Sequence, residues 1–351
     1  MLPTVERLAV SATSEFAFEL SVCQWAERAW SPSDDAAVLV ARQFGTKHRR
    51  WDTIVLECDP DGLRERAKFG TEAFGSDHLH VLQNAPADWT YYRDALPDPG
   101  YPWRYVRESI HEAADRDAIE TRKRSNRIEV RRVRPYPDWV RRIVAIENKP
   151  DLTASAARNL VPQLQRDIAL SLADEVWVAT ATTDERVEPI LLADLPAAAG
   201  VLTVDPESGT AETVWQPRSL SVDEPGTRIL DRPDDDTSAA QFEYVDTDWK
   251  HEHRLAIAER AYARGWRGYA DTMRPDCRHF HLSTDETGVY PHCAAKDCLP
   301  TAAECRGQCP SYEPEPPTWR SMDWPLDGGP GKAIKRLLAR RRRRQRPGLS
   351  E

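Results

Sequence analysis

The stretch Arg142-Ile143-Val144-Ala145-Ile146-Glu147-Asn148-Lys149 runs from four apolar residues into an acid, an amide and a lysine. A short apolar run of this kind predicts a buried strand, and we expect one over 141–147. Because side chains alternate between the two faces of a strand, Glu147 and Lys149 should project together while Asn148 points away. Charge at the end of a buried strand is costly unless it is paired. The alternative is that Glu147 and Lys149 only form a surface ion pair at the end of the strand.

A second stretch, Arg50-Trp51-Asp52-Thr53-Ile54-Val55-Leu56-Glu57, predicts another buried strand with Asp52 near its start. The run AVLVARQF at 37–44 predicts the strand before it, and Gly45-Thr46 supplies a turn, so the two should form a hairpin. If these strands neighbour 141–147, the carboxylates of Asp52 and Glu147 can meet.

Helices and further strands continue this pattern. Residues 13–30 predict a helix capped by Thr13 or Ser14. Residues 155–173 predict a second helix from leucine and isoleucine spaced by four, and Pro162 implies an irregular first turn. Strand candidates follow at 176–181, at 189–195 and on both sides of a turn at 206–209. The order is helix, strand, strand, insertion, strand, helix, strand.

The charge composition is acidic and poor in lysine. The chain has 351 residues with 57 Asp and Glu, 40 Arg and 8 Lys, giving a net charge of −9. This composition is typical of haloarchaeal proteins adapted to high salt, so the acidity reflects the solvent and does not argue against a nucleic-acid partner. High salt weakens phosphate binding, and such a partner would need many Arg contacts. No stretch of 18 apolar residues and no signal peptide occurs, so we expect a cytoplasmic protein without a membrane partner.

The insertion, residues 60–137, is basic at its end. A helix over 104–116 precedes two strand-like runs around Arg124-Ser125-Asn126. A helix followed by a basic hairpin resembles a winged helix with its wing, and Arg124 would then contact nucleic acid. A solvated charged hairpin explains the pattern equally well.

The last third of the chain alternates acidic and basic segments. Residues 218–249 are polar and acidic and predict a linker, and a helix is expected over 250–264. The tail over 335–346 is strongly basic, which predicts a polyanion-binding arm or a disordered tail without a specific partner. The candidate nucleic-acid-binding residues of this arm are Arg340, Arg341, Arg342, Arg343 and Arg344.

Five of the seven cysteines fall within 33 residues, at Cys277, Cys293, Cys298, Cys305 and Cys309. In a cytosolic chain this clustering favours a structural metal site, Zn²⁺ or a 4Fe-4S cluster, over disulfides. The spacing does not decide which four are ligands; we expect the last four. Free thiols in a flexible segment are the alternative. Cys23 and Cys58 lie in apolar segments and are expected to be core residues.

Taken together, the order of elements and the Glu-x-Lys strand resemble the PD-(D/E)XK, or restriction-endonuclease-like, phosphodiesterases, over about 11–59 and 138–217. The resemblance implies an α/β fold with an α-β-β-β-α-β core and a mixed sheet. It implies that Asp52 and Glu147 bind Mg²⁺ or Mn²⁺, that the residue 148 carbonyl adds a ligand, and that Lys149 positions the attacking water. Metal-assisted hydrolysis of DNA is the expected reaction.

The same resemblance implies a role for residues on both helices. Gln165 matches the glutamine of the second helix, with Gln163 as its competitor, and Glu15 matches the glutamate of the first helix, with Glu19 as the alternative. Gln43 stands where many members have another acidic residue.

Two departures and one rival accompany this assignment. Trp51 replaces the usual proline before the metal-binding aspartate, and the insertion between the second and third strands is unusually long. A second acidic-x-Lys, Asp248-Trp249-Lys250, lacks an apolar strand before it. The rival function is a non-catalytic nucleic-acid-binding protein on the same fold, using the Cys-rich site and the Arg-rich tail; a protein-interaction scaffold is a third.

The expected organisation has six parts. They are the first part of the core (1–59), the inserted subdomain (60–137), the second part of the core (138–217), the acidic linker (218–249), the Cys-rich metal-binding region (250–325) and the basic tail (326–351).

Overall fold

The structure is a computed structural model that describes residues 15–32, 35–45, 50–182, 194–206, 208–231, 239–266, 273, 277–285, 288–300, 304–305 and 309–313. These residues belong to two compact units, one of residues 21–266 and one formed by 1–20 with 267–351, and each is described by itself. The strand candidate at 189–195 lies almost entirely outside the described residues. No helix in the described ranges is long and apolar enough to cross a membrane.

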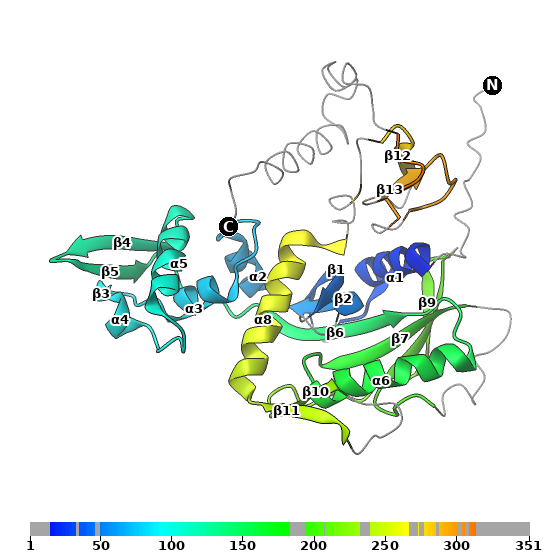
Figure 1. Ribbon diagram of the computed structural model, residues 1–351, viewed down its shortest axis with the longest axis horizontal. Helices are drawn as coiled ribbons and strands as arrows, with labels where there is room; N and C mark the ends of the chain where they lie inside the picture. Colours follow the sequence, from blue (N-terminus) through cyan, green and yellow to red (C-terminus); the bar gives the residue numbers. More distant parts are fainter. Residues whose placement is uncertain are drawn as a thin grey trace. The chain divides into compact units, whose positions relative to one another are not determined.

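A six-stranded mixed sheet organises the larger unit (Figure 1). Its strands, in spatial order, are β1 (Ala37–Gly45), β2 (Arg50–Cys58), β6 (Val140–Asn148), β7 (Glu175–Ala181), β8 (Gly200–Asp205) and β9 (Thr210–Trp215). The first three pair antiparallel, β6, β7 and β8 run parallel, and β9 returns antiparallel. The predicted hairpin of residues 37–57 and the predicted mixed α/β architecture are confirmed.

Helices precede and interrupt these strands in the expected order: α1 (Glu15–Ala29) comes before β1, and α6 (Ala154–Leu170) joins β6 to β7. Thr153 caps α6 by accepting a hydrogen bond from Ala156 N. The helix ends earlier than expected because Ser171 adopts a left-handed φ of 50°. Pro162 lies in the middle of α6, so the predicted irregular first turn is wrong.

The two faces of the sheet have different partners. Ile143 and Ala145 of β6 share a hydrophobic core with buried residues of α6 and of α8 (Thr247–Arg264). Val144 and Ile146 are buried on the opposite face, where Cys23 of α1 contacts Thr53 of β2. Burial on both faces is why β6 is apolar at every position from 143 to 146.

The insertion folds into helices and a small sheet, which form the lobe at the left of Figure 1. Its elements are α2 (Pro60–Ala67), α3 (Ser76–Asn84), β3 (Thr90–Tyr91), α4 (Tyr92–Ala95), α5 (Trp103–Asp115), β4 (Ile119–Arg124) and β5 (Arg127–Arg132). The strands pair antiparallel in the order β3-β5-β4. Ser125 and Asn126 have positive φ, as the tight turn of a two-residue hairpin requires.

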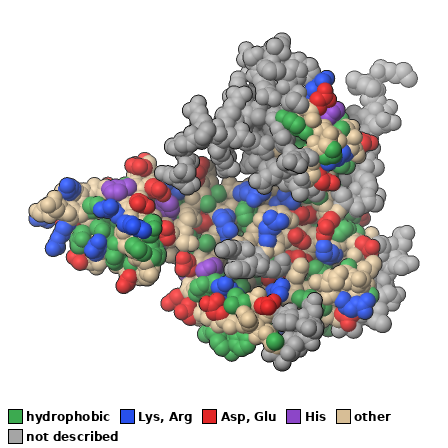
Figure 2. Space-filling view, in the orientation of Figure 1, with side chains coloured by type: hydrophobic (Ala, Val, Ile, Leu, Met, Phe, Trp, Pro, Cys, Tyr) green, Lys and Arg blue, Asp and Glu red, His purple; other side chains and the backbone are tan. Residues whose placement is uncertain are grey.

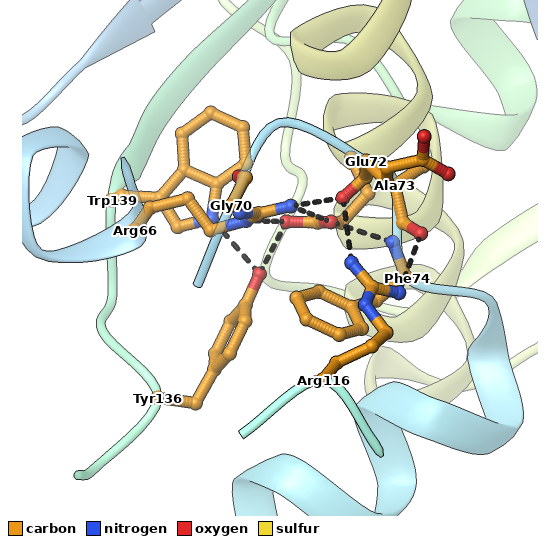
Figure 3. A network of polar contacts seen from close by, with 9 residues as sticks. Arg66, Gly70, Glu72, Ala73, Phe74, Arg116, Tyr136 and Trp139 are labelled. Carbon is orange, nitrogen blue, oxygen red and sulfur yellow. Dashed lines mark hydrogen bonds and ion pairs between the residues drawn. The ribbon is translucent and has the colours of Figure 1, made fainter. Parts of the chain in front are cut away.

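A buried polar network joins the insertion to α8 (Figure 3). Arg66 of α2 and Glu259 of α8 form an ion pair in which both side chains have 0% exposure. The Glu259 carboxylate also accepts hydrogen bonds from Tyr136 Oη at 2.6 Å and from Phe74 N at 2.9 Å. Arg116, directly after α5, donates to the carbonyl oxygens of residues 72 and 73. The insertion is therefore held to α8 at several points.

Residues 218–249 differ from the expected linker. They contain a hairpin of β10 (Gly226–Asp231) and β11 (Gln241–Val245). A Cβ at Gly226 would lie 2.4 Å from the carbonyl oxygen of Leu170, so this glycine allows the hairpin to approach α6 closely. Helix α8 packs against β1 and belongs to the unit of residues 21–266, whereas the described cysteines of the Cys-rich segment lie in the other unit.

The smaller unit contains β12 (Phe280–Asp285) and β13 (Gly288–Cys293), which pair antiparallel.

Candidate active site

The candidate acids meet where the pairing of β2 with β6 ends. Thr53 pairs with Ile146, so the next positions, Asp52 and Glu147, stand opposite each other. Directly opposed residues of an antiparallel pair project from the same face. That face also carries Ile143 and Ala145 and is the one packed against α6. Glu147 is 4% exposed and Asp52 is half-buried.

The carboxylate of Asp52 is oriented by two hydrogen bonds. Its Oδ2 accepts from the backbone N–H of Asn148 at 3.0 Å, and its Oδ1 accepts from Gln43 Nε2 at 3.3 Å. Gln43 has a left-handed φ of 58° inside β1, which is uncommon for a residue other than glycine. Each carboxylate oxygen has two lone pairs, so a single hydrogen bond does not use up the acceptor capacity of an oxygen.

Asn148 points to the other face, as the strand alternation predicts. Its Nδ2 donates to Thr53 Oγ1 at 2.9 Å, and the Thr53 hydroxyl also contacts Cys23 Sγ at 3.3 Å. Its side chain is thereby fixed away from Asp52, while its backbone N–H supports the Asp52 carboxylate.

Lys149 continues the extended backbone of β6. Its N–H donates to the carbonyl oxygen of Ala179 in β7 at 2.8 Å. This bond belongs to the last pair of the parallel ladder, Asn148 with Ala179, and we expect Lys149 to follow the alternation of Glu147. The side chain is half-buried.

The remaining site candidates lie on α6 and α1. Gln165 and its competitor Gln163 are both half-buried on α6. Burial does not separate the two glutamines, although α6 covers the face that carries Glu147. Glu15 is the exposed first residue of α1, and Glu19, one turn later, is buried.

Two other acidic residues, Glu57 and Asp248, resemble the candidate acids in the sequence but lie in other surroundings. Glu57, at the far end of β2, has 0% exposure and accepts hydrogen bonds from Trp30 Nε1 at 3.0 Å and from Arg142. The second acidic-x-Lys, Asp248 and Lys250, lies on α8, where residues two apart do not share a face. The ammonium of Lys250 is buried and donates to two main-chain carbonyl oxygens, each at 2.8 Å.

Four cysteines of the smaller unit line a cavity of about 20 Å³. Its lining includes Cys277, Cys293, Cys305 and Cys309. Cys298, which the sequence-based set includes in place of Cys277, is not in that lining. All described cysteines are free thiols, and no group of three or more His, Cys, Asp or Glu residues with metal-binding geometry occurs among the described residues.

Of the residues predicted to contact nucleic acid, only Arg124 is among the residues that the structure describes. Arg124 lies at the exposed turn of the β4–β5 hairpin, with Glu129 at 4.0 Å. The arginines of the tail, residues 340–344, lie outside the described residues.

Sequence reasoning missed the support that Asn148 N and Thr53 give the site, because strand pairing across the insertion had to be known first. It also missed the two exposed arginines in the first two turns of α5, for which the spacing of Arg104 and Arg107 was the available signal.

Comparison with curated proteins and with solved structures found no match to either. One family model matches residues 39–314, most of the chain. The chain therefore belongs to the family described as a family of unknown function, DUF5787.

Proposed function

We propose that this protein is a metal-dependent nuclease of the PD-(D/E)XK type that acts on DNA. The observation that carries the proposal is the register of β2 and β6, which sets Asp52 opposite Glu147. Lys149 follows two residues after Glu147, directly beyond the end of β6. A strand end with two opposed carboxylates and a lysine has the groups that phosphodiester hydrolysis needs.

The directions of the strands support the same proposal. Strands β1, β2 and β6 pair antiparallel in that order, β7 is parallel to β6, and helices stand before β1 and between β6 and β7. This order resembles the α-β-β-β-α-β core of restriction-endonuclease-like proteins and supports the proposal. The insertion between β2 and β6 does not disturb it, since β2 and β6 remain paired over six residue pairs.

The donor groups fit Mg²⁺ or Mn²⁺. Asp52, Glu147 and the carbonyl of residue 148 offer oxygen ligands, which hard divalent cations prefer. A cation held there supplies charge neutralisation at the phosphate and a more acidic bound water. The protein's own part is to orient Asp52 through Asn148 N and Gln43 and to present the Lys149 ammonium to a phosphate oxygen or to the water. Lysine suits that task as a compact point charge.

The Cys-rich segment is proposed to hold a structural metal, Zn²⁺ or a 4Fe-4S cluster. Four cysteines line one small cavity, Cys277, Cys293, Cys305 and Cys309, and four thiolates suit either group. A metal there would stabilise a segment that has little apolar sequence with which to form a core.

The deciding experiment is cleavage of end-labelled single- and double-stranded DNA, with RNA as a third substrate, in molar KCl with Mg²⁺ or Mn²⁺. Wild type is compared with Lys149→Ala and with Lys68→Ala, which changes an exposed lysine directly after α2. We expect metal-dependent cutting of DNA that is lost in Lys149→Ala and retained in Lys68→Ala. Full activity of Lys149→Ala would overturn the assignment of the site. Binding without cutting by every protein would instead favour the non-catalytic rival.

A further inference from the structure

Within the insertion, residues 76–132 form a module with a distinct chain order. Helix α3 is followed by β3, by the short α4, by α5 and by the β4–β5 hairpin. The strands pair as β3-β5-β4, so the first strand lies beside the last. This order of elements and of strands is that of a winged helix, in which the third helix and the final hairpin carry the contacts to nucleic acid.

Helix α5 has one buried and one exposed face. The buried side chains are Val106, Ser109, Ile110 and Ala113, which pack toward α3 and β4. Arg104, Arg107 and His111 are exposed, and they are spaced by three and four residues. Residues at that spacing share one side of a helix. The exposed side of α5 thus presents two arginines from its first two turns, and it also carries three exposed acids, Glu108, Glu112 and Asp115, that extend toward its C-terminal end.

The β4–β5 hairpin is strongly basic. Residues 119–134 contain seven Lys and Arg against two Glu, in a chain whose net charge is −9. Arg122, Lys123, Arg124 and Arg127 are exposed. Figure 2 shows Lys and Arg side chains gathered over the end of this lobe. Because the chain as a whole is acidic, this concentration of positive charge defines a site for a polyanion.

The stem of the hairpin is braced. Trp89 lies between Arg122 and Arg131, whose guanidinium carbons are 4.4 and 4.8 Å from its ring centroid. Arg122 pairs with Glu129 at 2.6 Å, and Arg131 pairs with Glu120. Arg122 and Arg131 therefore have partners within the module. Near the turn, Arg124 lies 4.0 Å from Glu129 and the Arg127 guanidinium carbon lies 5.1 Å from the Tyr91 ring centroid, and both arginines remain exposed to a ligand.

We propose that residues 76–132 are a duplex-DNA-binding module, with α5 in the major groove and the β4–β5 turn on the neighbouring phosphate backbone. An α-helix fits the major groove of B-form DNA, and arginine there contacts guanine in two hydrogen bonds. Residues at the start of the recognition helix make such contacts, which is where Arg104 and Arg107 lie. The inference rests on the proposed nuclease function, and it assigns that nuclease a double-stranded substrate.

Single strands and RNA fit this surface less well. Single-stranded nucleic acids bind to exposed aromatic platforms. Here Trp89 lies against Arg122 and Arg131, and Tyr92 and Trp103 pack edge-on against each other. Tyr105 of α5 is exposed, and the guanidinium of Arg104 lies over its ring. The deep, narrow major groove of an RNA duplex does not admit a helix.

The network of Figure 3 couples the module to the candidate site. Arg116, at the end of α5, bonds the loop of residues 72–73, and Glu259 of α8 bonds the next residue of that loop, Phe74. Because α8 in turn packs against β1 and β6, a duplex held by α5 has a defined position relative to β2 and β6.

The test is fluorescence anisotropy on the full chain carrying Lys149→Ala, without added Mg²⁺ or Mn²⁺, so that binding is measured apart from cleavage. The probes are a labelled duplex of about 20 base pairs, one of its single strands and the matching RNA duplex. Compared proteins carry Arg104→Ala with Arg107→Ala, or Arg124→Ala with Arg127→Ala. The control carries Arg64→Ala in α2 with Lys68→Ala directly after that helix. Both changes remove exposed positive charges outside residues 76–132.

We expect the duplex to bind at least about tenfold more tightly than the other probes, and the α5 pair to weaken duplex binding about tenfold or more. The turn pair should weaken binding uniformly across sequences and lower the salt slope by about one for each phosphate that the variant no longer neutralises. The control should bind as the parent does. Preference for the single strand or RNA, or unchanged duplex affinity in a correctly folded α5 variant, would overturn the inference. If binding follows expectation and wild type does not cut, the module stands and the nuclease proposal fails.

Discussion

The carboxylate of Asp52 accepts the backbone N–H of Asn148 at 3.0 Å, at the point where the ladder between β2 and β6 ends. The side chain thus supplies the acceptor that this N–H would otherwise lack within the sheet. Asp52 has a structural task and a proposed chemical one, and the two can be separated by substitution.

Asp52→Asn should retain the fold and abolish metal-dependent cleavage, because its amide oxygen can still accept from Asn148 N while the negative charge for the cation is gone. Asp52→Ala should in addition lower the free energy of unfolding by about 1–3 kcal/mol, the usual cost of a buried donor without a partner. Urea denaturation and the cleavage assay together check this. Equal stability of the two variants would show that the hydrogen bond contributes nothing.

The buried pair of Arg66 and Glu259 should be the most sensitive polar contact of the larger unit. Glu259→Ala leaves the Arg66 charge buried without its partner and also removes the acceptor of Phe74 N and Tyr136 Oη. We expect a loss of about 3–5 kcal/mol in the free energy of unfolding. Arg64→Ala, which breaks an exposed ion pair with Asp61, is the matched control and should have little effect.

A double-mutant cycle sharpens this test. Arg66→Ala combined with Glu259→Ala should cost less than the sum of the two single changes, because the second substitution removes the charge that the first leaves buried. Strict additivity would mean that the two side chains do not stabilise each other.

His80 should make stability depend on pH. Burial lowers the pKa of His80, with Glu252 and Asp77 opposing that shift, and its Nε2 has no hydrogen-bond partner among the described residues. The unfolded chain therefore binds this proton more readily than the folded one, and stability falls as pH drops below the usual histidine pKa of about 6.5.

The variant His80→Gln should lose less stability than wild type between about pH 7 and pH 5, the range in which the unfolded chain begins to take up this proton. Urea unfolding at several pH values measures the difference, with His251→Gln on the exposed face of α8 as the control. If the free energy of unfolding falls equally with pH in wild type and in His80→Gln, His80 is not the source of the pH dependence.

How far the sequence predicts this structure depends on where the energy of each element comes from. Strand β6 is predictable because burial on both faces demands an unbroken apolar run. The β10–β11 hairpin is not, because its acidic surroundings are typical of a linker and its position depends on the close approach of Gly226 to Leu170, a contact with no local signal. The sequence singles out Asp52 and Glu147 as candidate acids. That they stand opposite each other depends on the pairing of β2 with β6 across the whole insertion.

The choice of cysteine ligands shows the same limit, and it yields the last prediction. The spacing does not decide the ligands, and the set expected from the sequence is Cys293, Cys298, Cys305 and Cys309, yet the cavity is lined by Cys277 and not by Cys298. Cys298 is instead tied to Cys293 through the backbone, because Cys293 N donates to its carbonyl oxygen at 2.9 Å. Metal analysis of the purified full chain should find the bound zinc or iron greatly reduced in Cys277→Ser and retained in Cys298→Ser. If Cys298→Ser loses the metal and Cys277→Ser keeps it, the ligand set expected from the sequence is restored. An unchanged metal content in both variants would place the metal elsewhere.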